Sequence, residues 1–271
     1  MALDEAALET LGLATLWVRR SVPVDRGVDA GEATQPLAAG QDEARQAARE
    51  TVQLDPEPPR ARVTPLHDRV EAPLDSGIAQ LDWEALEARV AACQSCRLCE
   101  KRTKTVFGVG DRAADWMLIG EGPGENEDKQ GEPFVGQAGK LLDSMLHALT
   151  LARAENVYIA NVVKCRPPGN RNPEPDEVAR CEPYLQRQVA LVKPKLIVAL
   201  GRVAAQSLLK TDASISSLRG RVHRYEDVPV IVTYHPAYLL RSLQDKAKAW
   251  VDLCLALDTY RQLAAGRQAA R

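Results

Sequence analysis

The chain has 271 residues, a net charge of −2 and a hydrophobic content of 45%. This length and composition suit one good-sized domain with extensions. The charge gives no sign of a globally basic surface, so any contact with nucleic acid must be local. No apolar run approaches a membrane span, and the acidic N-terminus lacks the features of a signal peptide, so the sequence predicts a cytoplasmic protein.

The N-terminal part differs in composition from the rest. Residues 1–20 are predicted to form a short amphipathic helix, and residues 21–80, rich in Pro, Ala, Asp, Glu, Arg and Gln, a disordered linker. The helix either has no role or docks a partner at the end of a flexible tether. The compact domain is predicted to cover residues 81–271.

Strands and helices alternate along this domain. The expected strands cover residues 116–120, 157–163, 196–200 and 228–234, and the expected helices 83–92, 138–149, 175–192, 202–209 and 245–264. This alternation predicts a three-layer α/β/α domain with a central, mainly parallel four-stranded sheet. Ligands of such sheets bind at the carboxyl ends of the strands.

The first of these strands runs into glycines and carboxylates, in the sequence Gly120-Glu121-Gly122-Pro123-Gly124 and then Glu125, Glu127 and Asp128. The pattern is not a dinucleotide or Walker loop. Carboxylates repel phosphate but suit water positioning, base chemistry or hydrogen bonding to a ligand N–H. A solvated acidic turn is the alternative. Phe134, one of two phenylalanines, follows as an exposed stacking platform or as a core residue.

The last strand delivers His235 to the same edge of the sheet, directly before Pro236. At this position a neutral imidazole can donate a hydrogen bond to a developing anion. A structural histidine is the alternative.

Four cysteines are candidate ligands: Cys93 and Cys96, two residues apart, with Cys165 and Cys181 farther along. Four thiolates can surround zinc or an iron–sulfur cluster, and the spacing leaves both open. Cys99 is an ambiguous fifth candidate. Cys254 lies in an apolar helix and is predicted to be a core residue.

Residues 84–262 resemble a family 4 uracil-DNA glycosylase, the iron–sulfur type. The resemblance rests on four motifs in order: the Cys93/Cys96 pair, GEGPGENEDKQGEPFVGQAG, NVVKCRPPGNRNP ending in Cys181, and HPAYLLR. It implies the α/β/α uracil-glycosylase fold and a [4Fe–4S] cluster on Cys93, Cys96, Cys165 and Cys181. It also implies hydrolysis of the N-glycosidic bond of deoxyuridine in DNA, which leaves an abasic site.

The resemblance also assigns roles. Glu121 holds the attacking water and His235 stabilises the charge on uracil O2. Phe134 stacks on the flipped base, Asn161 reads its edge and Glu127 disfavours the 5-methyl of thymine, while Gly122 and Asn170 complete the substrate site. Local positive charge for DNA is expected from Lys164, Arg166, Arg171 and Arg241. Leu239 and Leu240 could wedge into the gap left by the flipped base or pack in a helix.

Other functions stay open at this point. The chain could hold uracil-DNA without turnover, or work as an iron–sulfur redox protein. A related branch captures uracil-DNA covalently through a histidine in a basic loop. Residues 217–223 contain arginines and His223 but lack that branch's longer insertion. The expected partner is uracil-containing DNA at the nucleoid, bound by a monomer whose N-terminal helix docks a repair or replication protein.

Overall fold

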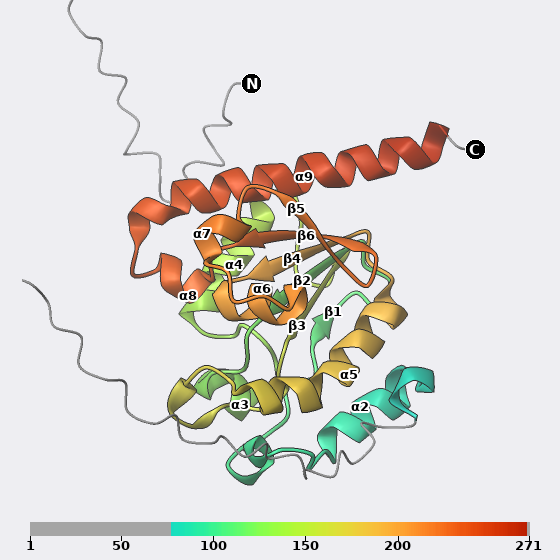
Figure 1. The fold of residues 1–271 in the computed structure, drawn as a ribbon, viewed down its shortest axis with the longest axis vertical. Coiled ribbons are helices and arrows are strands. Elements are labelled where there is room, and N and C mark those ends of the chain that lie inside the picture. The colour runs from blue at the N-terminus through green and yellow to red at the C-terminus, as the bar shows by residue number, and fades with distance from the viewer. Residues whose placement is uncertain (1–76, 270–271) are drawn as a thin grey trace, which may run out of the picture. The chain divides into compact units, whose positions relative to one another are not determined.

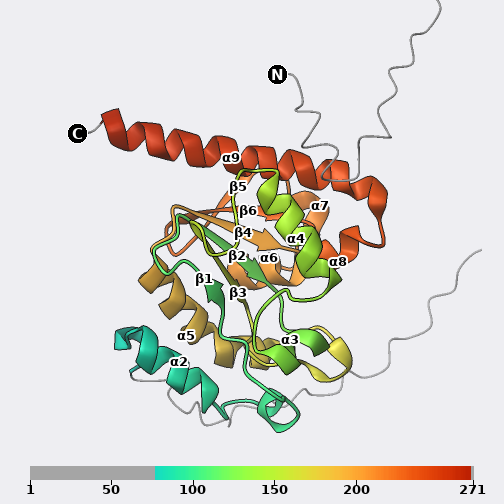
Figure 2. The same ribbon diagram turned by 180° about the vertical axis from the view of Figure 1, so that it is seen from behind.

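The computed structural model describes residues 77–269. The helix predicted at residues 1–20 and nearly all of the linker predicted at residues 21–80 lie outside the described residues. The described part is a six-stranded sheet with helices on both faces (Figures 1 and 2). Ile78 is already buried in a core cluster with Leu86, so core packing includes residues just before position 81.

The strand order is β1-β3-β2-β4-β6-β5. The four central strands are parallel, which confirms the predicted four-stranded core. They are β2 (Trp116–Gly120), β3 (Val157–Asn161), β4 (Leu196–Leu200) and β6 (Val228–Thr233). Their runs of Val, Ile, Leu and Ala are buried on both faces, as expected of strands inside a parallel sheet.

Two short antiparallel strands at the edges were not predicted. They are β1 (Val109–Gly110), paired with β3, and β5 (Val222–Tyr225), paired with β6. β1 is too short to give a pattern. In β5 only the last residue is buried, so the apolar run that marks the central strands is missing.

Alternate strand residues face opposite helical layers. Trp116 and Leu118 pack with residues of α4, α8 and α9, whereas Met117 and Ile119 pack with residues of α5 and α6. α2 lies outside α5 (Figure 1). The helices are α2 (Trp83–Ala91), α3 (Glu125–Gln130), α4 (Gln137–His147), α5 (Pro175–Val192), α6 (Arg202–Leu209), α7 (Ile215–Leu218), α8 (Pro236–Leu239) and α9 (Lys246–Ala269), with 3-10 turns η2 (Ile78–Gln80), η3 (Arg97–Glu100), η4 (Pro168–Asn170) and η5 (Leu243–Asp245).

Local sequence signals fix the boundaries of α5. Pro175 occupies the first turn, where its missing N–H has no cost. The Glu177 carboxylate accepts a hydrogen bond from the backbone N of Glu174 at 2.8 Å. The helix ends at Val192, and the next residue, Lys193, caps it with a φ of 53°. These signals account for the agreement with the predicted bounds of residues 175–192.

All four parallel strands point their carboxyl ends to the same edge of the sheet. There the chain continues into Glu121 after β2, Gly201 after β4 and Tyr234 and His235 after β6, while β3 ends in Asn161 itself. Within residues 77–269, no helix combines the length and the apolar character that crossing a membrane requires.

Candidate active site

A cavity of about 720 Å³ opens at this carboxyl edge. It brings together most of the residues predicted for the site. Those that line it are Glu121, Gly122, Glu127, Phe134, Asn161, Asn170, Arg171, His235 and Arg241. The cavity follows from the topology, because parallel strands deliver their following residues to one edge.

Asn161 supplies an unpaired hydrogen-bonding group to this cavity. It is the last residue of β3, is 2% exposed, and its amide oxygen has no hydrogen-bond partner among the described residues. The opposite residue, Gly120, leaves room for this amide. A Cβ atom at position 120 would lie 2.4 Å from the Asn161 oxygen and 2.7 Å from Cζ of Phe134. The amide and the aromatic ring therefore meet at one point of the cavity wall, where a flat polar ligand can use both.

His235 is held in one tautomer by its own backbone. The N–H of Ala237 donates to Nδ1 of the imidazole at 3.1 Å, so the proton of the neutral ring lies on Nε2. Burial and the nearby Arg241 lower the pKa of His235 to about 4, against a smaller opposing influence of Glu127. The ring stacks on Phe134 with centroids 5.4 Å apart at 29°. At neutral pH the site thus contains an uncharged N–H donor.

Glu121 is the carboxylate of the cavity that has no hydrogen-bond partner among the described residues. Burial raises its pKa, and the positive charge of Arg202 opposes the rise. A half-buried carboxylate of this kind can hold a water molecule and accept its proton.

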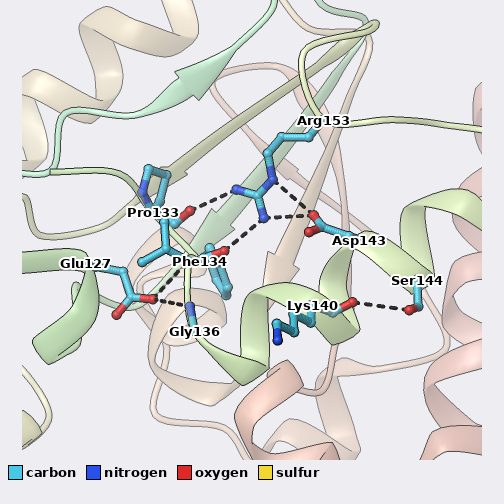
Figure 3. A network of polar contacts seen from close by, with 9 residues as sticks. Glu127, Pro133, Phe134, Gly136, Lys140, Asp143, Ser144 and Arg153 are labelled. Carbon is cyan, nitrogen blue, oxygen red and sulfur yellow. Dashed lines mark hydrogen bonds and ion pairs between the residues drawn. The ribbon is translucent and has the colours of Figure 1, made fainter. Parts of the chain in front are cut away.

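The Glu127 carboxylate, which was predicted to act on the ligand, also accepts hydrogen bonds from the protein's own backbone. One carboxylate oxygen accepts from the backbone N of Val135 at 2.9 Å and of Gly136 at 3.3 Å, and the other accepts from Gly124 N at 3.1 Å. Figure 3 shows the first two contacts. Glu127 therefore ties the start of α3 to the segment that carries Phe134, while it lines the cavity.

Several cationic residues expected at DNA are engaged within the protein. Arg171 lines the cavity but pairs with the buried Glu177 at 2.7 Å. Arg166 does not line it and donates to the Asn170 amide oxygen at 2.7 Å. Arg241 lines the cavity and is exposed.

Two sequence expectations need correction. Lys164 is 1% exposed, and its ammonium group donates to the backbone oxygen of Asn161 at 2.8 Å and to the Gln188 amide at 2.6 Å, so it cannot contact DNA phosphates. Leu239 is also 1% exposed and packs in the core, so it cannot act as a wedge. Leu240, 42% exposed, is the residue of this pair that reaches the surface.

Sequence reasoning missed other lining residues, notably Arg202, Tyr234 and Tyr238. The signal was available at Arg202, which follows Gly201 directly after a predicted strand. Gly201 has a φ of 93°, and a Cβ there would lie 2.8 Å from Cβ of His235. This glycine brings the end of β4 against the histidine. His223, in contrast, lies in β5, bonds the Leu218 carbonyl at 2.7 Å and is absent from the cavity.

A second, smaller cavity collects the cysteines. Cys93, Cys96, Cys99, Cys165 and Cys181 all line it, whereas Cys254 lies apart in α9. Within residues 77–269, no three His, Cys, Asp or Glu side chains are close enough to hold a single metal ion. The two findings are compatible, because a cluster of several metal atoms keeps its ligands farther apart than one ion does. The donor set fits an iron–sulfur cluster: several thiols surround one cavity, and N–H donors reach two of the sulfurs.

These donors and the charge nearby act against the effect of burial, which favours neutral thiols. Arg102 Nη1 lies 3.1 Å from Cys165 Sγ, and the backbone N of Lys164 lies 3.3 Å from Cys181 Sγ. Burial raises the pKa of the Cys181 thiol to about 12, with Lys164 opposing the rise. Burial lowers the pKa of Lys164 to about 8, with Cys181 and Cys165 opposing. A bound metal group would reverse the preference for neutral thiols.

Fold and site together define an α/β/α domain whose cavity at the carboxyl edge of the sheet contains a buried amide, an aromatic ring and an uncharged histidine. Comparison with known proteins makes this class specific. The model of the Uracil DNA glycosylase superfamily matches residues 107–256. The chain therefore belongs to the uracil-DNA glycosylase superfamily.

Curated relatives agree with the predicted family 4. The chain is 46% identical to the type-4 uracil-DNA glycosylase of Sulfurisphaera tokodaii over 165 residues, which cover 58% of this chain and 75% of that protein. It is 47% identical to the type-4 enzyme of Archaeoglobus fulgidus over 168 residues, or 58% and 84%. Similarity to the type-5 enzyme of Thermus thermophilus is lower, at 31% over 160 residues, or 48% and 73%.

Proposed function

We propose that this protein is a monofunctional uracil-DNA glycosylase that hydrolyses the N-glycosidic bond of deoxyuridine in DNA. The observation that carries the proposal is the buried, unpaired amide oxygen of Asn161 beside the ring of Phe134. An unpaired buried polar group is costly unless a ligand satisfies it. Uracil presents a ring face for stacking and an N3–H and O4 edge for an amide.

The substrate base must leave the DNA stack to reach this cavity. In our proposal the flipped uracil stacks on Phe134 and pairs with the Asn161 amide. Cytosine presents the opposite donor and acceptor pattern on part of that edge, so the amide discriminates against it. Glu127 and the backbone segment that it holds form the wall that disfavours the 5-methyl group of thymine.

Bond cleavage moves the electron pair of the C1′–N1 bond onto the uracil ring, with negative charge on O2 and positive charge on the sugar. The Nε2–H of His235 is placed to donate to O2. A neutral imidazole suits this role because it can donate a hydrogen bond to the anion without transferring its proton. Stabilising a charge that develops only in the transition state raises the rate of the chemical step.

Water completes the hydrolysis. Glu121 holds the water against C1′, its negative charge offsets the sugar cation, and its carboxylate accepts the water proton as the new C1′–O bond forms. The products are an abasic sugar and the uracil anion, which takes up a proton from water to give free uracil, while Glu121 returns its proton to the solvent. No lysine ammonium among the lining residues offers an amine for Schiff-base formation, so strand cleavage by a lyase step is not part of the proposal.

We also propose a [4Fe–4S] cluster held by Cys93, Cys96, Cys165 and Cys181. Gathering of these thiols around one cavity supports a polynuclear cluster over a single zinc ion, whose thiolates would sit about 2.3 Å from one centre. The cluster would cross-link three chain segments and supply no chemistry to the hydrolysis. Cys99 lines the same cavity and is the alternative ligand.

We propose that Arg241 and the exposed Leu240, beside the histidine motif, contact DNA. Arg166 and Arg171, in the loop after β3, are the other proposed contacts. We further propose that the protein acts as a monomer on nucleoid DNA in the cytoplasm and that a repair or replication protein docks on its N-terminal segment.

The test is a gel assay on a labelled oligonucleotide with one deoxyuridine, followed by alkali. We expect cleavage with the wild type and strong loss with His235→Ala. His223→Ala is the matched control, because that histidine lies outside the cavity. Absence of cleavage from a folded, iron-loaded protein would favour a binding or redox role. A protein–DNA adduct that survives denaturation would instead indicate covalent capture.

A further inference from the structure

Phe134 has a backbone conformation that is unusual for its residue type. Its φ is 56°, in the left-handed region, although it is a bulky residue and 7% exposed. Side chains with a Cβ are disfavoured there by contact with the following carbonyl. Such a conformation persists only where surrounding contacts hold it. The contacts that hold Phe134 in this conformation therefore contribute to the position of its ring.

One guanidinium group holds the carbonyls on one side of this turn. Arg153, in the loop between α4 and β3, donates from Nη1 to the Pro133 oxygen at 2.9 Å and from Nη2 to the Phe134 oxygen at 2.9 Å (Figure 3). Asp143 of α4 orients the guanidinium through contacts of 3.0 Å to Nε and 2.8 Å to Nη2. The rigid fork of arginine can bind two adjacent carbonyls in this way, whereas a lysine ammonium cannot reproduce the geometry.

The next two backbone groups are held by Glu127, which accepts from the N–H of Val135 and of Gly136. Two backbone carbonyls and two backbone N–H groups, between the Pro133 oxygen and the Gly136 nitrogen, thus bond charged side chains. α4 closes the turn from a third direction, since a Cβ at Gly139 would lie 1.7 Å from the Phe134 oxygen. The turn has little freedom while these contacts persist.

The fixed turn determines where the Phe134 ring lies. The ring contacts the position above Gly120, beside the Asn161 amide, and stacks on His235. Arg153 itself is absent from the lining of the cavity. Any effect of Arg153 on a bound base must therefore pass through the turn and its aromatic ring.

We propose that Arg153 is a positioning residue that holds Phe134 in its left-handed turn and so sets the stacking face for the flipped base before DNA binds. This inference deepens the proposed function and rests on it for the identity of the base. Without Arg153, the Phe134 segment can relax to ordinary backbone conformations, and the ring then occupies the stacking position only part of the time. Capture of the base decreases in proportion, because the competent conformer is less populated.

The test is a cycle of Arg153→Met, Phe134→Leu and the double variant, assayed by uracil release under single-turnover conditions. We expect Arg153→Met to lower kcat/KM on the order of tenfold. In the double variant the rate should equal that of Phe134→Leu alone, because Arg153 acts through the ring. Arg153→Lys should recover part of the loss, since an ammonium can bond one carbonyl of the two.

The matched control is Arg224→Met. Arg224 also donates to the backbone oxygen of a left-handed residue, Asp227, whose φ is 61°, but in the β5–β6 turn outside the cavity. We expect this variant to keep the wild-type rate. If the loss of rate in the double variant equals the product of the two single losses, the two residues act independently and the proposal is overturned. A loss in Arg224→Met equal to that in Arg153→Met would also overturn it.

A second readout does not need catalysis. Amide hydrogen exchange over residues 133–139 should accelerate in Arg153→Met and stay unchanged in Arg224→Met. Unchanged exchange in Arg153→Met would overturn the positioning role. If the wild type releases no uracil, the proposed glycosylase function fails, and the exchange measurement still decides whether Arg153 holds the turn.

Discussion

Gly120 and Asn161 are paired across β2 and β3, and a Cβ atom at position 120 would lie 2.4 Å from the Asn161 amide oxygen. Gly120 has no positive φ, so alanine is compatible with its backbone. Its side chain would intrude on the amide and the Phe134 ring. We expect Gly120→Ala to lower uracil release by at least tenfold while thermal unfolding shifts by only a few degrees. A variant with the wild-type rate would show that this corner of the cavity does not hold the base.

His235 links stability to pH. Its folded-state pKa of about 4 lies below the ordinary value of 6.5. Between these values the unfolded chain binds a proton that the folded chain does not, so stability falls as pH decreases from about 6.5 to about 4. We expect this to amount to roughly 3 kcal/mol. Urea unfolding of wild type and His235→Gln at several pH values measures it, and equal pH slopes would contradict it.

Arg202 should tune the pH dependence of activity. Burial raises the pKa of Glu121 and the Arg202 charge opposes that rise. Arg202→Gln removes the opposition, so the pKa of Glu121 rises further and the acid limb of kcat/KM moves to higher pH. The pH profile of single-turnover uracil release measures the shift. Arg221→Gln, at the β5 edge and outside the cavity, is the control and should leave the limb in place.

Cys165 and Cys254 offer a matched pair for the proposed cluster. Cys165 lines the cysteine cavity, whereas Cys254 lies in α9. We expect Cys165→Ser to lower iron content, solubility and the thermal midpoint together, because the cluster would cross-link separate segments. Cys254→Ser should retain full iron. A well-folded Cys165→Ser protein without iron and with full activity would contradict a structural cluster.

Substitutions at Leu239 and Leu240 should distinguish a role in core packing from a role in DNA contact. Leu239→Ala removes a buried side chain, and we expect a loss of roughly 2–5 kcal/mol in the free energy of unfolding. Leu240→Ala should leave that free energy within about 0.5 kcal/mol. Under the proposed wedge role it should lower uracil release from duplex more than from single-stranded DNA. An equal effect on both substrates would remove Leu240 from the wedge.

The central sheet and the long helices could be predicted because their signals are local. Buried parallel strands are apolar throughout, and α5 has both a proline start and a capping glutamate. The carboxyl edge then brought Glu121, Asn161 and His235 together by topology alone. The sequence could not predict which side chains point into the protein and which point to the surface. Lys164 stands between Val163 and Cys165 with nothing to mark it as buried, and only its contact with Gln188 of α5 places it inside.

The four residues of α8 show the same limit. A helix this short has no periodicity to separate Leu239 from Leu240, so either could have faced the core. Arg202 was missed for a related reason, since a charged residue at a helix start is common and only the cavity gives it a role. Phe134 is a third case, because its left-handed turn depends on Arg153 and Glu127, which come from other segments.

The two antiparallel edge strands also affect how this protein behaves in crowded surroundings. A parallel sheet ending in an apolar strand would offer free N–H and C=O groups to any extended chain. β1 presents only two residues at one edge, and β5 exposes Val222 and Arg224 at the other. Short edges and charged side chains discourage pairing between molecules. Within the described residues, the short β1 and the exposed Arg224 of β5 therefore disfavour pairing between molecules at the two margins of the sheet.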